Sequence, residues 1–158
     1  MPPAEMSTIE DLATELGRRA RADGFTVATA ESLTGGLLSS ALASRSEAAS
    51  WFRGAVVAYA SQVKFDVLGV RPGPVVTEDT ARQMAEGTAR LLGADVVLAT
   101  TGVGGPDPEE EKEPGTVWLA VHGTPRTLTR LERFEGDPAT VCVASCRAAI
   151  ELALELTG

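Results

Sequence analysis

The feature that most constrains the fold is the alternation of helical segments with short apolar segments. Helical periodicity runs over residues 9–23, 37–44, 61–68, 77–92 and 138–156, and residues 25–29, 51–59 and 94–100 are apolar segments of strand length. We expect the strand at 51–59 to be largely buried. Continuously apolar strands need a covering layer on both faces. The chain is therefore predicted to be an α/β protein, a three-layer α/β/α sandwich with a mixed, mostly parallel sheet.

Turn and cap residues extend this prediction. Segments 116–122 and 126–134 flank Gly123-Thr124-Pro125, which predicts a hairpin and makes the sheet mixed. Ser7 with Glu10 forms a capping-box pattern before the first helix, and Asp137 with Pro138 is a typical start for the last one. The 158 residues fit one domain, expected over 8–158, preceded by a flexible tail over 1–7.

Charge and hydropathy exclude several classes of partner. The net charge of −8 argues against a broad nucleic-acid footprint and against an anionic membrane surface, because both select basic faces. Residues 1–7 lack the basic end and apolar stretch of a signal peptide, and no segment approaches the ~20 apolar residues of a membrane span. We expect a cytoplasmic protein.

The sulfur and imidazole groups are few. Cys142 and Cys146 are the only cysteines and His122 is the only histidine, which argues against a disulfide framework and a zinc site. Both thiols fit small buried apolar residues, with a redox or substrate-contact role as the alternative. His122 fits a structural or surface position.

Three segments place polar residues and glycine after predicted strands. They are "TAESLTGG" (29–36), "YASQVK" (59–64) and "TTGVGGP" (100–106). Ligands of open α/β sheets bind beyond the carboxyl ends of the strands, so we expect the three segments to converge on one pocket. Neither glycine cluster matches a Walker or dinucleotide fingerprint, which disfavours a nucleoside triphosphate site.

Ser32 is the candidate nucleophile of the first segment. A serine needs a neighbouring base, and with histidine nearly absent Lys64 is the candidate, although a solvated lysine on a helix flank fits the same spacing. Gly35 and Gly36 fit either a tight turn or backbone donors for an anion or an oxyanion.

The carboxylates allow two interpretations each. Glu31 pairs with Asp66 in one, and in the other it stabilises the following helix start through the helix dipole. The acidic run at 109–113 fits a solvated loop, with metal coordination as the minor alternative.

Five stretches in order resemble the C-terminal domain family of the competence-damage-inducible protein CinA, in its stand-alone form. They are "TAESLTGGLLSSAL" (29–42), "WFRGAVVAYASQVKFDVLGV" (51–70), "VTEDTARQMAEG" (76–87), "LGADVVLATTGVGGPD" (92–107) and "PGTVWLAV" (114–121). The resemblance covers residues 8 to 157. It implies an α/β/α sandwich that hydrolyses the carboxamide of nicotinamide mononucleotide to nicotinate mononucleotide and ammonia. It also implies that no metal or other cofactor is needed, and that the protein forms a homo-oligomer.

The resemblance implies roles for individual residues. Ser32 would attack the amide carbon, Lys64 would be the general base, and Tyr59 would belong to its hydrogen-bonding network. Arg53 would support the pocket, either within the chain or across a subunit interface. Thr101 and the backbone of residues 102–105 would hold the carboxamide or its oxyanion. The residues implied in substrate binding are Thr34, Gly35, Gly36, Arg53, Thr101, Gly102, Gly104 and Gly105.

The last helix departs from the family pattern. Where the family has two arginines that are expected to bind the substrate phosphate, this chain has Pro138 and Cys142. Arg147 lies five positions after Cys142, about 140° around the helix, and is a poor substitute. We therefore expect an amidohydrolase of nicotinamide mononucleotide, with two alternatives: the same chemistry on a different amide, and a non-catalytic binding or regulatory paralogue.

Overall fold

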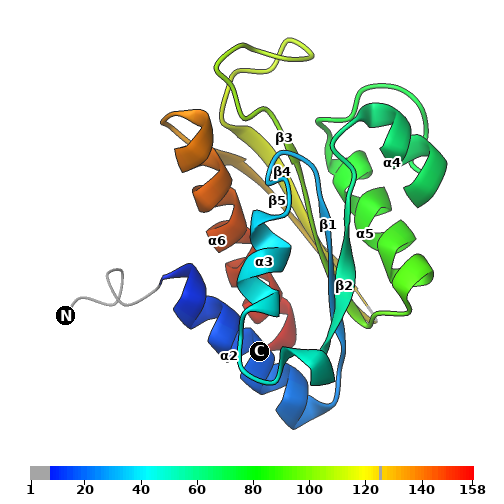
Figure 1. Cartoon of the computed structure of the whole chain (residues 1–158). Coiled ribbons are helices and arrows are strands. Elements are labelled where there is room, and N and C mark those ends of the chain that lie inside the picture. The colour runs from blue at the N-terminus through cyan, green and yellow to red at the C-terminus, as the bar shows by residue number, and fades with distance from the viewer. Residues whose placement is uncertain (1–7, 125) are drawn as a thin grey trace.

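The computed structural model describes residues 8–124 and 126–158 (Figure 1). The expected tail at 1–7 and Pro125 of the hairpin connection lie outside the described residues. The helices are α2 (Ile9–Asp23), α3 (Leu37–Ala43), the 3-10 helix η1 (Ala48–Ser50), α4 (Ser61–Leu68), α5 (Glu78–Leu92) and α6 (Pro138–Thr157). The strands are β1 (Val27–Glu31), β2 (Phe52–Val57), β3 (Val96–Gly102), β4 (Thr116–His122) and β5 (Thr127–Arg133).

The strands form one sheet in the order β2-β1-β3-β4-β5. Strand β1 pairs in parallel with β2 and with β3, whereas β4 is antiparallel to both β3 and β5. Strand β4 therefore runs against the other four, and the predicted mixed, mostly parallel sheet is confirmed. The carboxyl ends of β1, β2 and β3 meet at one edge, which is the upper edge in Figure 1.

Helices cover the sheet on both faces, as predicted. Helices α2, α3 and α6 lie on one face, and α4 and α5 lie on the other (Figure 1). The strand residues on the first face are bulky, and those on the second face are mainly alanine: Val27, Leu98, Leu119 and Val121 against Ala28, Ala30, Ala99 and Ala120. Small strand residues leave room for α5 to pack close to the sheet.

Helices α4 and α5 also pack closely on each other. A Cβ atom added to Gly87 of α5 would lie 2.1 Å from the main-chain oxygen of Leu68 at the end of α4, so only glycine fits there. Because α4 carries Lys64, this contact sets the position of that side chain.

The helix caps agree with the sequence except at the first helix. Asp137 caps α6 with Pro138 in its first turn, as predicted, and its carboxylate accepts from the Thr140 amide. For α2 the prediction was wrong by one residue. Thr8 rather than Ser7 is the N-cap, because the Thr8 hydroxyl accepts from the Asp11 amide.

Strand β2 is shorter and more exposed than predicted. It spans Phe52–Val57 instead of 51–59, and Val57 is 45% exposed. The reason is topological: β2 is an edge strand that pairs with β1 alone, so one of its sides has no neighbouring strand. No helix in the described part of the chain is both long enough and apolar enough to cross a membrane.

Candidate active site

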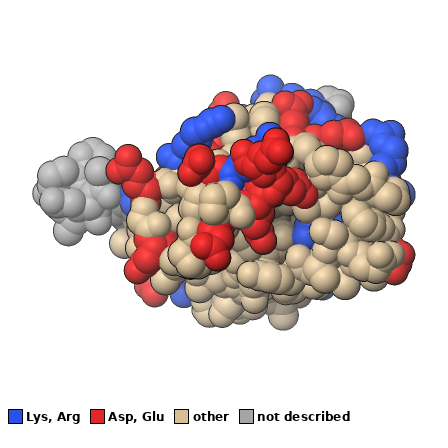
Figure 2. Space-filling model, turned by 90° about the horizontal axis from the view of Figure 1, so that it is seen from above, with Lys and Arg blue, Asp and Glu red and all other residues tan. Residues whose placement is uncertain are grey.

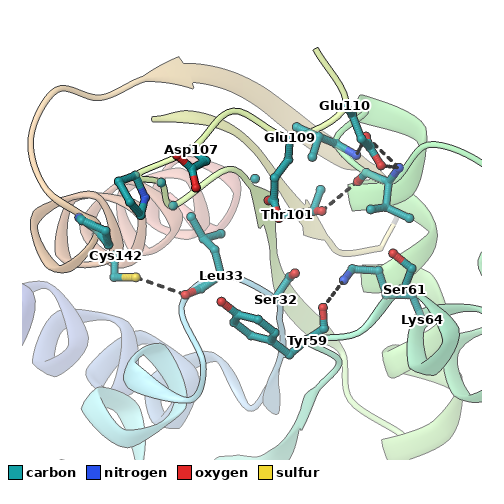
Figure 3. A pocket seen from close by; sticks show the side chains of 17 residues that line it. Ser32, Leu33, Tyr59, Ser61, Lys64, Thr101, Asp107, Glu109, Glu110 and Cys142 are labelled. Atoms are coloured by element: carbon teal, nitrogen blue, oxygen red, sulfur yellow. Dashed lines mark hydrogen bonds between the residues drawn. The ribbon is translucent and has the colours of Figure 1, made fainter. Parts of the chain in front are cut away.

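A cavity of about 360 Å³ opens at the carboxyl ends of the parallel strands (Figure 3). All three polar and glycine-bearing segments contribute to it, as expected from the sequence. Its lining consists of Ser32, Leu33, Tyr59, Ser61, Lys64, Val75, Val76, Thr101, Gly102, Gly104, Gly105, Pro106, Asp107, Glu109, Glu110, Pro138 and Cys142. A volume in this range suits a small organic ligand.

Ser32 follows the last residue of β1 and points into the cavity (Figure 3). Its main-chain amide donates to the Thr100 hydroxyl at 3.3 Å, and its carbonyl accepts from the Gly35 amide at 3.0 Å. The residue is only 7% exposed, yet its Oγ makes no hydrogen bond to any described residue. This Oγ is not one of the fully buried unpaired atoms of the described residues, so it stays accessible from the cavity and is available to a ligand.

Glu31 organises the turn that carries Ser32. Its carboxylate is fully buried and accepts from three main-chain amides, those of Gly36 (3.2 Å), Leu38 (2.9 Å) and Ser39 (2.8 Å). These amides begin α3, so the carboxylate binds the free N–H groups and the positive end of the helix dipole. The helix-start interpretation of Glu31 is confirmed. The pairing with Asp66 is wrong, because Asp66 accepts from Gln62 on α4 instead.

The two glycines of the turn do not face the cavity. Gly35 and Gly36 have φ values of 57° and 108°, which favour glycine. Their amides are used inside the turn, by Ser32 O and by the Glu31 carboxylate, and neither residue is part of the lining. Thr34 is likewise buried behind the cavity, with its hydroxyl 3.0 Å from that of Thr100. These three residues shape the turn, and their expected substrate contacts stay a prediction.

Lys64 is buried in the wall of the cavity. It is 1% exposed, and its Nζ donates to the carbonyls of Ala58 at 2.8 Å and Tyr59 at 3.1 Å. The solvated-lysine interpretation is wrong. Burial lowers the pKa of the Lys64 amine, and the carboxylates of Glu110 and Glu109 oppose that change.

The two carbonyls suit a neutral amine. A neutral amine has two N–H bonds, which match two acceptors, and one lone pair, which then remains for a third direction. Within the described residues Nζ makes no hydrogen bond to Ser32 Oγ, although both side chains line the same cavity. Lys64 can therefore accept a proton from a hydroxyl, such as that of Ser32, once ligand binding brings the hydroxyl within hydrogen-bond distance of Nζ.

Tyr59 belongs to the Lys64 network through its main chain. Its carbonyl accepts from Nζ, while its side chain is 71% exposed at the mouth of the cavity and lies beside Ser32 in Figure 3. The expected hydrogen-bonding role is therefore performed by the backbone, and the ring is left free to contact a ligand.

The loop after β3 forms the opposite wall. The Thr101 hydroxyl donates to the Val75 carbonyl at 2.8 Å, and a Cβ atom on Gly102 would lie 2.6 Å from the Thr116 carbonyl oxygen. The amides of Gly104 and Gly105, like that of Leu33 on the first wall, make no hydrogen bond to a described residue. These three amides are available as donors to a ligand oxygen.

The acidic loop is part of the cavity, which the sequence did not indicate. Both oxygens of Glu110 accept from the amides of Val75 and Val76, at distances of 2.8 to 3.1 Å, so the loop is docked before α5. Asp107 and Glu109 line the cavity beside it. Residues 109–113 are solvent-exposed, as expected from the sequence, and Glu109 and Glu110 also border the cavity. The partners of Glu110 are main-chain groups far along the chain, which leave no side-chain signature.

Arg53 lies away from the cavity. It stands near the amino end of β2, and its Nε donates to the Leu92 carbonyl at 2.7 Å at the end of α5. In a parallel arrangement the amino end of β2 is at the edge opposite to the cavity, which explains why the expected support of the pocket is not seen within the chain. Its place at a subunit interface stays a prediction.

Pro138 and Cys142 line the cavity where α6 begins. The Cys142 thiol donates to the Leu33 carbonyl at 3.1 Å, and burial raises its pKa. Cys146 is buried, and burial raises its pKa as well, so both thiols resist ionisation.

His122 lies on β4 with its ring near the Thr127 hydroxyl and outside the cavity, in agreement with a structural position.

Comparisons with known proteins place the chain in one family. The sequence model of the CinA C-terminal domain family matches residues 9–157, and the chain belongs to that family. Protein YdeJ of Escherichia coli K12 is 36% identical over 96% of this chain and 92% of its own length. The nicotinamide-nucleotide amidohydrolase PncC of Enterobacter agglomerans is 33% identical over 92% of this chain and 93% of its own length.

Structural comparison gives the same result. A crystal structure of a CinA superfamily protein from Escherichia coli superposes with a TM-score of 0.94 at 35% identity, covering 99% of this chain and 94% of that one. A CinA-like protein from Frankia casuarinae is 42% identical over 80% of this chain, but the match spans only 30% of the Frankia protein. The longer relatives therefore carry the domain as one part.

Proposed function

We propose that this protein is an amidohydrolase that converts the carboxamide of a nicotinamide nucleotide or nucleoside to the carboxylate and ammonia. The observation that carries the proposal is the hydroxyl of Ser32, which opens to the cavity without a partner among the described residues and shares that cavity with the buried amine of Lys64. The name of the relative PncC and the sequence resemblance support nicotinamide mononucleotide as the substrate to test first.

The reaction begins with attack by Ser32. Its Oγ bonds to the carboxamide carbon while its proton passes to the Nζ of Lys64. The carbonyl π bond opens, and the oxygen becomes an oxyanion. The free amides of Leu33, Gly104 and Gly105 are the candidate donors to this oxyanion.

Release of ammonia completes the first half. The carbon–nitrogen bond breaks, the leaving nitrogen takes the proton from Lys64, and an acyl ester remains on Ser32. Water then attacks the ester, with Lys64 again accepting a proton and returning it to Ser32 Oγ as the carboxylic acid leaves, and the acid gives its remaining proton to the solvent. No net proton or electron is taken from the protein.

The test is ammonia release from nicotinamide mononucleotide and from nicotinamide riboside. We expect Ser32→Ala and Lys64→Met to lower kcat at least ~10³-fold, because each removes a group acting only in the chemical step. Ser44→Ala, on the exposed end of α3, is the matched serine control and should keep the wild-type rate. Wild-type turnover by Ser32→Ala contradicts the mechanism. Absence of ammonia from both compounds contradicts the function and favours a non-catalytic binding protein.

A further inference from the structure

The cavity is acidic. Among the described residues that line it, Lys64 is the only lysine or arginine, against the three carboxylates of Asp107, Glu109 and Glu110. Glu110 is held by two main-chain amides, whereas the carboxylates of Asp107 and Glu109 make no hydrogen bond or ion pair with a described residue. Figure 3 shows both side chains on the cavity wall, and Figure 2 shows acidic side chains gathered over the middle of this face. Both residues are solvent-exposed and border the ligand space without a described cation paired to them.

Apart from Lys64, no lining residue in the part of the chain that the structure describes carries a basic group that could pair with a phosphate. At the start of α6 the lining residues are Pro138 and Cys142, neither of which carries a positive charge. Arg147 forms an ion pair with Glu151 further along the helix and is not part of the lining. The N-terminus of α6 would attract an anion through its dipole, but the carboxylate of Asp137 already binds the Thr140 amide there.

Ser32 is an independent feature of this acidic space that points to a ligand. It is 93% buried by its 7% exposure, and its Oγ lacks a partner among the described residues while facing the cavity. A reactive hydroxyl therefore lies on one wall and unpaired carboxylates lie on another. A ligand of this cavity therefore places an electrophilic carbon next to Ser32, and its other part lies beside the negative charges of Asp107 and Glu109.

We propose that the cavity selects a cationic, phosphate-free nicotinamide nucleoside over its phosphorylated counterpart, an inference that rests on the proposed amidohydrolase function. A nicotinamide ring bonded through its nitrogen to ribose is a pyridinium cation, which the carboxylates of Asp107 and Glu109 attract. A phosphate dianion on the same ribose outweighs the ring charge and is repelled by these carboxylates. We call this selection by the carboxylates of Asp107 and Glu109 a charge filter. It discriminates between two ligands that carry the same carboxamide but differ in the phosphate.

Binding measured by calorimetry on the Ser32→Ala background tests the filter without turnover. Nicotinamide riboside should bind at least ~10-fold more tightly than nicotinamide mononucleotide at low ionic strength, and the difference should shrink with added salt. Benzamide riboside, the neutral isostere of the cation, should bind more weakly than nicotinamide riboside. Equal or tighter binding of the mononucleotide overturns the inference, and so does equal binding of the two ribosides.

Charge-neutralising substitutions assign the effect to the wall. Asp107→Asn with Glu109→Gln should weaken riboside binding and strengthen mononucleotide binding, which brings the two Kd values to within ~2-fold. Glu111→Gln, on the same loop but outside the lining, should leave both Kd values unchanged. If the double variant keeps the wild-type ratio, the carboxylates do not select the ligand and the inference falls.

These experiments distinguish a failure of the charge filter from a failure of the proposed amidohydrolase function. Preferential riboside binding without ammonia release supports the charge filter and contradicts the amidohydrolase. Ammonia release with kcat/KM higher for the mononucleotide supports the amidohydrolase and contradicts the filter. The variant Pro138→Arg with Cys142→Arg, which restores two cations to the lining, should tighten mononucleotide binding and make it more salt-sensitive. Unchanged mononucleotide binding by this variant counts against the filter.

Discussion

At the residue scale, Glu31 and Lys64 are buried ionisable residues that serve the same cavity in different ways. Glu31 is satisfied by three main-chain amides and holds the Ser32 turn in place. Lys64 is held by two carbonyls and keeps one direction for chemistry. The sequence predicted Ser32 and Lys64 as partners of one site. It left Glu31 between two roles, because the amides that decide the question have no side-chain signature.

Replacing Glu31 by Gln should destabilise the protein. Glutamine keeps one oxygen but turns an NH₂ group toward an amide that needs an acceptor, and hydrogen bonds to a charged group are worth about 1.5–3 kcal/mol. We expect the free energy of unfolding to fall by about 3 kcal/mol in urea denaturation. Glu86→Gln, whose side chain makes no hydrogen bond with a described residue, is the matched control and should change it by less than about 0.5 kcal/mol. A loss no larger than that of the control would contradict the role of Glu31.

The pH dependence of turnover should depend on Glu109. Lys64 acts as a base only when its amine is neutral, so kcat rises as pH rises through the pKa of Lys64. Burial lowers that pKa, and the Glu109 carboxylate opposes the change by favouring the charged amine. Glu109→Gln should therefore lower the pKa further and move the midpoint of the kcat–pH profile to lower pH.

The Glu109 prediction has its own control. The profile of Glu111→Gln should match that of the wild type, since Glu111 is outside the cavity. A midpoint that stays in place or moves to higher pH in Glu109→Gln would show that Lys64 does not set the profile.

At the element scale, the site depends on how α4 is held. The bounds of α4 were predicted from the sequence, because Gly69 ends the helix and the following prolines and glycine prevent its continuation. Its packing against α5 could not be predicted from the sequence. Gly87 is inside a helix, where glycine has no function in the helix itself, and the atom that it approaches is the main-chain oxygen of Leu68. The docking of Glu110 on the segment before α5 was missed for the same reason.

Replacing Gly87 by Ala should disturb both stability and turnover. The added Cβ atom would meet the Leu68 oxygen at 2.1 Å, so α4 has to move away from α5 and takes Lys64 with it. Overpacking of this kind costs about 1–3 kcal/mol, and we expect a free energy of unfolding lower by about 2 kcal/mol together with a reduced kcat. Glu86→Ala, one residue earlier, should leave kcat unchanged. A Gly87→Ala variant with wild-type stability would contradict the close packing.

At the scale of the whole molecule, the topology alone brings the site together. Alternating helices and strands predicted that β1, β2 and β3 end at one edge, and the three polar segments meet there. Arg53 lies at the opposite edge, because it stands near the amino end of β2 and bonds to the Leu92 carbonyl there. The acidic character of the cavity arises only when the loop after β3 folds back across the site, and composition cannot show that.

The central claim is that Ser32 carries an acyl group during turnover. The most direct measurement is intact-protein and peptide mass spectrometry after rapid acid quench of the enzyme with nicotinamide riboside or mononucleotide. The account predicts an ester adduct of the nicotinoyl substrate, less ammonia, on the peptide that contains Ser32, and no adduct in Ser32→Ala. An adduct on another residue, or ammonia release by Ser32→Ala at the wild-type rate, would contradict it.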